Sequence, residues 1–319
     1  MMPSLLYFVV IFISSYLLIK STALFINSST KIARFFSLSG YTVTFLLIAI
    51  STSLPETVVG ITSALEKNPI LSFGNAIGSN IAMLTLVLAI PILIGTNIGT
   101  HQAIKSGDIY RMGIFSLLPI LLSIDGTLTK IDGIILLTGY VGNALLVIRR
   151  STGLENLIDR IEHGYINIWK QAVVFGLALL LIVASSEAIV RSATSISDAL
   201  GLSLGFVGLT LTAIGTSLPE LTFTISAMKR RKPQEVLGDI TGGVIANSTF
   251  VLGITSIIHP IVVNKSNIGP STLIFMIITL AIFLRVAKTK EKLDKKEAVV
   301  LLGVYVLFIL VEYYLQSVK

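Results

Sequence analysis

The sequence predicts an all-α polytopic membrane protein of about ten transmembrane helices, arranged as two inverted five-helix repeats. Three observations predict this fold: apolar runs long enough to cross a bilayer, an alternating distribution of basic residues between the loops, and a motif that recurs at a fixed offset. The composition agrees, because 53% of the residues are hydrophobic and only 13% are charged, about half the charged share of an ordinary soluble domain.

The apolar runs define the expected spans, since a helix needs about 20 apolar residues to cross a hydrocarbon core about 30 Å thick. They cover residues 4–26, 41–65, 70–94, 112–124, 132–149, 171–195, 204–228, 235–258, 271–287 and 297–315. No basic residue precedes the first run, so we expect a retained membrane helix and not a signal peptide. The fourth run is short, and we expect its helix to be extended or tilted.

Basic residues alternate between the two sides of the predicted membrane. The loops after the odd-numbered spans hold 18 of the 24 Lys and Arg residues, whereas the opposite loops and both termini hold 5. Because short basic loops stay in the cytoplasm, this split places them there and both termini outside. The basic cluster Lys229–Lys232 is then a topology anchor, and no nucleic-acid partner is expected.

A polar linker at residues 151–170 divides the chain near its midpoint. We expect a first five-helix repeat over residues 1–150 and a second over residues 171–319, with the linker in the cytoplasm. The linker is too short for a regulatory domain and lacks the pattern of an EF-hand.

An internal repeat supports this division. AISTSLPE at residues 49–56 recurs as AIGTSLPE at residues 213–220, an offset of 164, and the matches extend over residues 49–88 and 213–252. The copies lie five spans apart, and an odd number of spans makes the second copy enter the membrane from the opposite side. Inverted repeats place a substrate site at their interface near the bilayer midplane.

Each repeat carries one glutamate, Glu56 or Glu220, inside an apolar run. A carboxylate at this depth is costly unless it is paired, protonated or facing a polar cavity. Snorkelling from a helix end is the alternative, but Glu56 has apolar stretches on both sides. Pro55 and Pro219 directly precede the glutamates, and each frees a backbone carbonyl that can line a cavity.

The two motifs together offer a set of hard oxygen ligands. Besides the two carboxylates and the freed carbonyls, the hydroxyl groups are those of Thr52, Ser53, Thr216 and Ser217. Calcium takes six to eight oxygen ligands, and two carboxylates neutralise a divalent ion in a dry site. The chain has no cysteine, and none of its three histidines falls within a span, so zinc, copper and iron fit poorly.

The helices that follow the motifs contain GNAIGSNIAM at residues 74–83 and GDITGGVIAN at residues 238–247. Their glycines predict close helix packing, namely Gly74, Gly78, Gly238 and Gly242. Packing does not account for their polar residues, some of which should complete the site: Asn75, Ser79, Asn80, Asp239, Thr241 and Asn247. Asp239 either snorkels to the cytoplasm or belongs to a proton or ion path.

At these residues the sequence resembles the calcium/cation antiporter superfamily of sodium/calcium and proton/calcium exchangers, in its prokaryotic ten-helix form. The resemblance covers the whole chain and rests on the doubled TSLPE motif and on GNAIGSN. It implies calcium binding by Glu56 and Glu220, with the backbone carbonyls of Thr52 and Thr216. The positions that it implies for a counter-ion, or for support of the site, are Ala49, Ser53, Ser79, Ala213, Ser217 and Asn247.

Two positions depart from the family pattern. Gly243 stands where the repeat partner of Ser79 should offer a hydroxyl, and Met83 stands where the partner of Asn247 should be polar. These departures remove oxygen ligands from the implied sodium sites, so they favour protons over sodium as the coupling ion. Sodium/calcium exchange is the alternative, because proton/calcium exchangers usually carry a glutamate motif other than TSLPE.

The resemblance thus implies a secondary antiporter, not an enzyme, that exchanges Ca²⁺ for a counter-cation by alternating access, with spans 4–26 and 171–195 as the moving gate. An intramembrane metal-dependent enzyme would need a nucleophile and base or histidines at membrane depth. A passive cation channel would conduct without a counter-ion. We expect no cofactor and no obligate protein partner. The expected partners are the lipid bilayer of a prokaryotic cell membrane and the transported ions.

Overall fold

The computed structural model describes residues 4–35, 53–94, 98–99, 106–150, 167–229, 233–264, 268–289 and 292–317. These residues form ten successive helical stretches, which confirms the all-helical prediction. In chain order they are α1 (Ser4–Phe35); α3 (Leu54–Leu65); α4 (Pro69–Ala82) continuing through the π-helical turn η1 (Met83–Val87) into α5 (Leu88–Leu93); α6 (Ser106–Leu122); α7 (Lys130–Arg150); α9 (Ile168–Leu200); α10 (Leu204–Val207) continuing through η2 (Gly208–Thr212), α11 (Ala213–Thr216) and α12 (Leu218–Lys229); α13 (Pro233–Ala246) continuing through η3 (Asn247–Val251) into α14 (Leu252–Ile258); α15 (Pro270–Thr289); and α16 (Lys295–Ser317).

Seven of the described stretches are long and apolar enough to cross a membrane, and two shorter apolar helices lie at Leu54–Leu65 and Pro270–Arg285. The N-terminal part of the second predicted span, residues 41–52, lies outside the described residues. The fourth helix is extended, as expected, because α6 begins at Ser106, ahead of the apolar run. Its polar first turns are compatible with a helix since Asp108 pairs with Arg111 three residues later.

The helices repeat at the offset found in the motifs. α1 begins at residue 4 and α9 at residue 168, α4 at 69 and α13 at 233, and α6 at 106 and α15 at 270. The π-helical turns η1 and η3 also begin 164 residues apart, at Met83 and Asn247. The duplication therefore extends from the motifs to the helices and to their local irregularities.

Each π-helical turn contains a threonine that bonds back to its own helix. The Thr85 hydroxyl donates to the Ile81 carbonyl at 2.5 Å, and its repeat equivalent Thr249 donates to the Ile245 carbonyl at 2.6 Å. In η2, Thr210 donates to the carbonyl four residues earlier at 2.8 Å. A hydroxyl that bonds to this carbonyl competes with the backbone N–H and bends or widens the helix. Such π-helical turns are frequent at functional sites.

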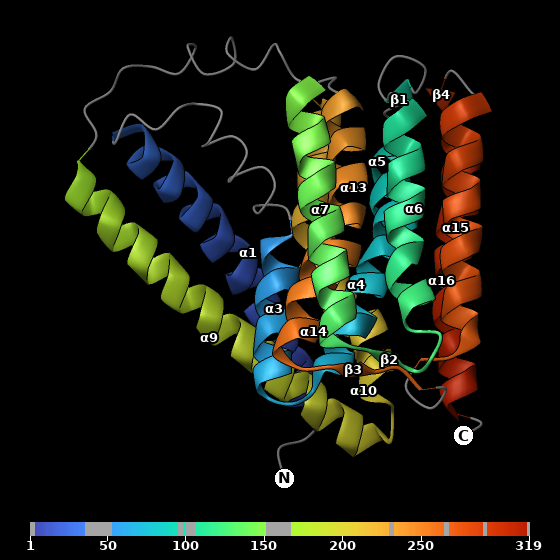
Figure 1. Cartoon of the computed structure of the whole chain (residues 1–319), viewed down its shortest axis with the longest axis horizontal. Helices are drawn as coiled ribbons and strands as arrows, with labels where there is room; N and C mark the ends of the chain where they lie inside the picture. Colours follow the sequence, from blue (N-terminus) through green and yellow to red (C-terminus); the bar gives the residue numbers. More distant parts are fainter. Residues whose placement is uncertain are drawn as a thin grey trace.

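α1 and α9 lie side by side and run obliquely to the upright helices of the main bundle (Figure 1). They have 32 and 33 residues, so at about 1.5 Å per residue they are about 48 and 50 Å long. Helices of this length exceed a hydrocarbon core of about 30 Å and must tilt to stay within it. Their buried side chains belong to a hydrophobic cluster distinct from the main core. This cluster joins the two helices to the bundle, because it also contains Val59 of α3, Leu71 of α4 and Val207 of α10; its members from α1 and α9 include Ile11, Leu18, Ile182, Ile189 and Ile196.

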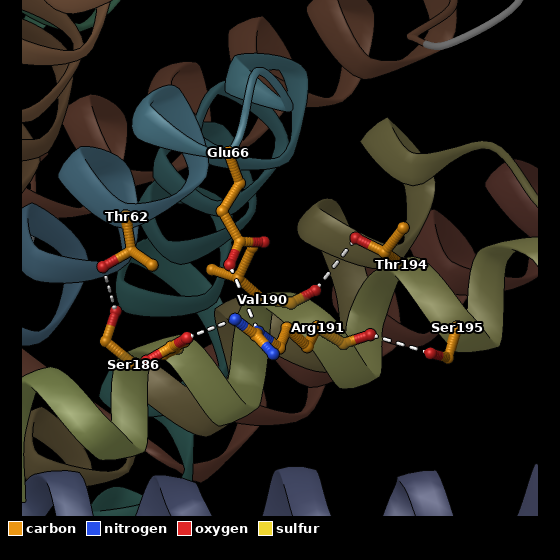
Figure 2. A network of polar contacts seen from close by, with 8 residues as sticks. Thr62, Glu66, Ser186, Val190, Arg191, Thr194 and Ser195 are labelled. Atoms are coloured by element: carbon orange, nitrogen blue, oxygen red, sulfur yellow. Dashed lines mark hydrogen bonds and ion pairs between the residues drawn. The ribbon is translucent and has the colours of Figure 1, made fainter. Parts of the chain in front are cut away.

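A small polar network joins α9 to α3 near one end of the bundle (Figure 2). The Ser186 hydroxyl donates to Thr62 at 3.0 Å. Arg191 forms ion pairs with Glu187 at 2.5 Å on its own helix and with Glu66 at 3.4 Å. The Arg191 side chain is 70% exposed, and exposed ion pairs contribute at most about 1 kcal/mol. The network therefore holds α9 against the bundle only weakly.

Two short strand pairs link the halves of the molecule. β1 (Ile98–Gly99) pairs antiparallel with β4 (Lys292–Leu293), and β2 (Thr127–Leu128) pairs antiparallel with β3 (Ile261–Val262). Each pair takes one strand from the first half and one from the second. The helices are interleaved in the same way, since α4 packs on α10 and η2 while α14 packs on α7.

Glycines on α4 allow this helix to approach the second repeat at backbone distance. A Cβ atom added at Gly74 would lie 2.2 Å from the Gly205 carbonyl oxygen, and one at Gly78 would lie 2.3 Å from the Leu209 carbonyl oxygen. The predicted close packing is thus confirmed for these two glycines. No described atom lies within 4 Å of a Cβ added at Gly238 or Gly242, and close packing there stays a prediction.

Candidate functional site

In each TSLPE motif a helix begins directly after the serine, and in the second repeat this start interrupts a longer helical stretch. α11 ends at Thr216 and α12 begins at Leu218, with Ser217 at φ −86° and ψ 2° between them. In the first repeat α3 begins at Leu54, directly after Ser53 at φ −102° and ψ 17°. The proline of each motif then occupies the start of the new helix, where its missing N–H breaks no helical hydrogen bond. The motif therefore places its glutamate in the first turn of a helix.

Glu56 and Glu220 are both buried, with 0% and 3% of their surfaces exposed. Both oxygens of Glu56, and Oε2 of Glu220, have no hydrogen-bond partner among the described residues. The two carboxylates lie within electrostatic range of each other. The helix N-terminus favours negative charge in its first turn, but two buried carboxylates that interact with each other and have unpartnered oxygens require protons or a cation.

Buried polar side chains form one flank of this carboxylate pair. The Thr216 hydroxyl donates to Asn75 Oδ1 at 3.1 Å and lies 3.3 Å from the Ser79 hydroxyl. The Thr216 and Ser79 hydroxyls also lie beside the Glu56 carboxyl group. Asn75 and Ser79 stand four residues apart on α4, so one face of this helix supplies both groups. We call Asn75, Ser79 and Thr216 the hydroxyl flank.

The other flank differs in chemistry. The repeat equivalents of Asn75, Ser79 and Met83 are Asp239, Gly243 and Asn247. Asn247 Nδ2 lies 4.0 Å from Met83 Sδ, and a Cβ added at Gly243 would lie 2.5 Å from Met83 Cε. We call Met83 and Gly243 the methionine flank.

Asp239 lies within electrostatic range of both glutamates, and its Oδ2 is buried without a described partner. Its side chain is partly exposed. This position relates Asp239 to the carboxylate pair, and its assignment to a proton or ion path stays a prediction.

The oxygen chemistry of the site suits a hard cation. Among the described residues, no three His, Cys, Asp or Glu side chains gather closely enough to hold a metal ion. A cation bound here would therefore combine two carboxylates with hydroxyl, amide and backbone oxygens. Calcium accepts this mixture, because it binds six to eight oxygens in flexible geometry.

The remaining predicted site residues can be placed in part. Ser53 and Ser217 are buried at the two helix interruptions, and Ser217 Oγ has no described partner. Ala213 is fully buried, and its carbonyl accepts a hydrogen bond from the Ser217 N–H at 3.0 Å. Ala49 and Thr52 lie outside the described residues, so their roles stay predictions.

The structure gives specific partners to polar residues that the sequence named only as a group, and it adds Ser248. Asn75 is the acceptor for Thr216, and its four-residue spacing from Ser79 places both on one face of α4. Asn80 donates to Ser248 at 2.7 Å, a bond that ties the two repeats together behind the site. Ser248 has no polar equivalent in the first repeat, where Leu84 occupies that position, so the repeat gave no indication of it.

Known proteins resemble this chain over nearly its whole length. The family described as sodium/calcium exchanger protein matches residues 6–149 and 170–314, one match in each half. The putative antiporter CaxA of Alkalimonas amylolytica is 30% identical over 299 residues, which cover 91% of this chain and 93% of that protein. The sodium/calcium exchanger MaX1 of Methanosarcina acetivorans is 23% identical over 350 residues, covering 97% and 99%.

The fold agrees with a solved exchanger. The structure of the sodium–calcium exchanger NCX_Mj soaked with 10 mM Na⁺ and 10 mM Sr²⁺ superimposes with a TM-score of 0.64 at 27% identity, covering 96% of this chain and 98% of that one. Three findings agree on the family: the matches in both halves, the similarity to CaxA and the shared fold. The chain is an integral membrane protein that belongs to the sodium/calcium exchanger family.

Proposed function

We propose that this protein is a secondary antiporter that moves Ca²⁺ against a counter-cation through Glu56 and Glu220. The observation that carries the proposal is the pair of buried carboxylates, since three of their four oxygens lack a partner among the described residues. Two negative charges match one divalent cation, and the inverted repeats give the two faces of the membrane equivalent access to it. The relatives named as exchangers and as an antiporter support the same activity.

Protons are the favoured counter-ion in this proposal. When Ca²⁺ leaves, the two carboxylates must be neutralised, and protons do this without further oxygen ligands. The methionine flank supports this choice because Gly243 offers no hydroxyl and a thioether is a weak acceptor. Sodium is the alternative, supported by the hydroxyl flank and by the sodium/calcium exchangers among the relatives.

The pair α1 and α9 is the proposed moving gate. Most of the buried residues in a hydrophobic cluster distinct from the main core come from these two helices, and weak polar contacts join α9 to α3. α1 also reaches the second motif, since a Cβ added at Gly215 would lie 2.4 Å from Ser15 Oγ. Movement of this pair along the bundle would change access to the carboxylates from either side.

Calcium-45 uptake into proteoliposomes tests the function and its coupling. We expect uptake when an outward proton gradient is imposed without sodium, and little uptake with an outward sodium gradient at symmetric pH. Uptake driven only by sodium would assign the alternative coupling. Uptake that needs neither gradient would contradict antiport and indicate a channel.

Replacement of the Thr216 hydroxyl should weaken calcium binding. Thr216→Val keeps the shape of the side chain but removes a buried group beside Glu56. We expect the KM for calcium uptake to rise about tenfold, because Asn75 Oδ1 loses its buried hydrogen bond, worth about 1.4 kcal/mol. Thr279→Val is the matched control, because Thr279 is also buried but bonds to the Met276 carbonyl on α15. Equal KM values in both variants would contradict a role for Thr216.

The proposed orientation places both termini outside a prokaryotic cell membrane and the basic loops in the cytoplasm. The chain has no cysteine, so a single introduced cysteine reports its side without background. We expect an impermeant maleimide to label Lys130→Cys on intact cells, and Lys229→Cys only after permeabilisation. The reverse pattern would invert the proposed topology.

A further inference from the structure

Ser79 on the hydroxyl flank and Gly243 on the methionine flank are equivalent positions of the two repeats, but the flanks offer different ligands. On the hydroxyl flank, Thr216 and Ser79 present two hydroxyl groups 3.3 Å apart, and both are buried. Hard cations take oxygen ligands of this kind. This flank can therefore hold a metal ion beside the glutamates.

On the methionine flank, a thioether takes the place of oxygen ligands. Met83 is fully buried, and its Cε and Sδ would lie 2.5 and 3.2 Å from a Cβ added at Gly243. The Met83 side chain thus fills the volume into which a side chain at position 243 would project. Sulfur of a thioether is a soft ligand and a weak acceptor, so it does not replace the missing hydroxyl for a hard cation.

The two departures from the repeat, Met83 and Gly243, depend on each other because their atoms are in contact. A serine at position 243 would meet the methyl end of Met83, which is flexible but enclosed on all sides. The methionine would have to move, and its nearest polar neighbour is the Asn247 amide at 4.0 Å. Gly243 therefore makes room for Met83, and Met83 occupies the space that Gly243 leaves.

We propose that Met83, seated on Gly243, is a plug that closes one of two symmetry-related cation positions beside the glutamates. The inference rests on the proposed function, because it takes Glu56 and Glu220 as the cation site. It deepens that function by stating which residues limit the number of metal counter-ions. Of the two flanks, only the hydroxyl flank then remains able to hold a sodium-sized ion.

The test restores the symmetry of the repeats. Met83→Asn copies Asn247, and Gly243→Ser copies Ser79; the two changes are combined in one protein. The first measurement is the rise in Tm of the purified protein when NaCl replaces choline chloride. A ligand that binds only the folded state raises Tm, and we expect a rise at least about threefold larger in the double variant than in wild type.

The second measurement is the sodium dependence of calcium-45 uptake. An added binding position should raise the Hill coefficient for sodium by about one in the double variant. Gly243→Ser alone should lower Tm without sodium, and Met83→Ala should restore the Tm of that variant. Gly303→Ser is the control for serine in a helix, because no described atom lies within 4 Å of a Cβ there.

If the folded double variant responded to sodium like wild type in both measurements, the proposal that Met83 closes a cation position would be wrong. A Gly243→Ser protein whose Tm equals that of Gly303→Ser would also overturn the proposal. If wild type takes up no calcium under any gradient, the proposed function fails, yet the sodium-dependent Tm still decides whether Met83 closes a cation position.

Discussion

Glu56→Gln is expected to abolish calcium transport, and Glu220→Gln is expected to do the same. Glutamine keeps the size of the side chain but removes the negative charge and turns one oxygen into an NH₂ donor. Losing such a charged ligand costs about 3 kcal/mol, so the initial rate of calcium-45 uptake at low calcium should fall at least about a hundredfold. Because the site has two buried carboxylates, neither should compensate for the other.

Stability measurements separate this loss from misfolding. An unpaired buried carboxylate is costly, so each glutamine variant should melt no lower than wild type without calcium, while the rise in Tm on adding calcium disappears. Glu66→Gln is the matched control on the same segment, since Glu66 pairs with Arg191 and is 29% exposed. Uptake near the wild-type rate in a folded Glu56→Gln or Glu220→Gln protein would contradict the proposed site.

Gly74→Ala is expected to destabilise the protein severely. Its added Cβ would lie 2.2 Å from the Gly205 carbonyl oxygen and 2.9 Å from the Leu209 backbone nitrogen. Backbone atoms cannot move away by changing rotamer, so α4 and α10 would have to separate. We expect a loss of about 3 kcal/mol or more, at the upper end of overpacking effects, measured as a fall in Tm of the purified protein.

The control variants for this prediction should change Tm in the opposite direction or leave it unchanged. Gly142→Ala and Gly303→Ala add the same methyl group to helices where no described atom lies within 4 Å. Alanine is favoured over glycine within a helix by up to about 1 kcal/mol, so these variants should melt at or above the wild-type temperature. If Gly74→Ala had the same Tm as these two control variants, the close backbone contact between α4 and α10 would be contradicted.

Much of the architecture was predictable because it depends on composition along the chain. The span lengths follow from the bilayer, and the recurrence of TSLPE located both glutamates and their relation by an inverted repeat. The start of α3 after Ser53 and the helix interruption at Ser217 were likewise signalled by the prolines that follow. Such features are encoded locally, so a single sequence is enough to find them.

Other features depend on contacts between distant residues. The predicted fourth span omitted Ser106 to Arg111, because hydropathy counts Asp108 and Arg111 as charges and ignores their pairing. Met83 and Gly243 were recognised as separate departures, but their contact depends on how η1 and α13 face each other. The bond from Thr216 to Asn75 depends on how α11 packs on α4. Periodicity within one helix defines neither arrangement.

The two strand pairs and the glycine contacts of α4 both join one half of the molecule to the other. Among the described residues, β1 and β2 pair with β4 and β3 of the other half, and α4 packs its glycines against α10, η2 and α11. A single half would leave its strand edges and its glutamate without counterparts. One half expressed alone would therefore need a second half, inserted in the opposite orientation, to complete its strand pairs and its pair of carboxylates.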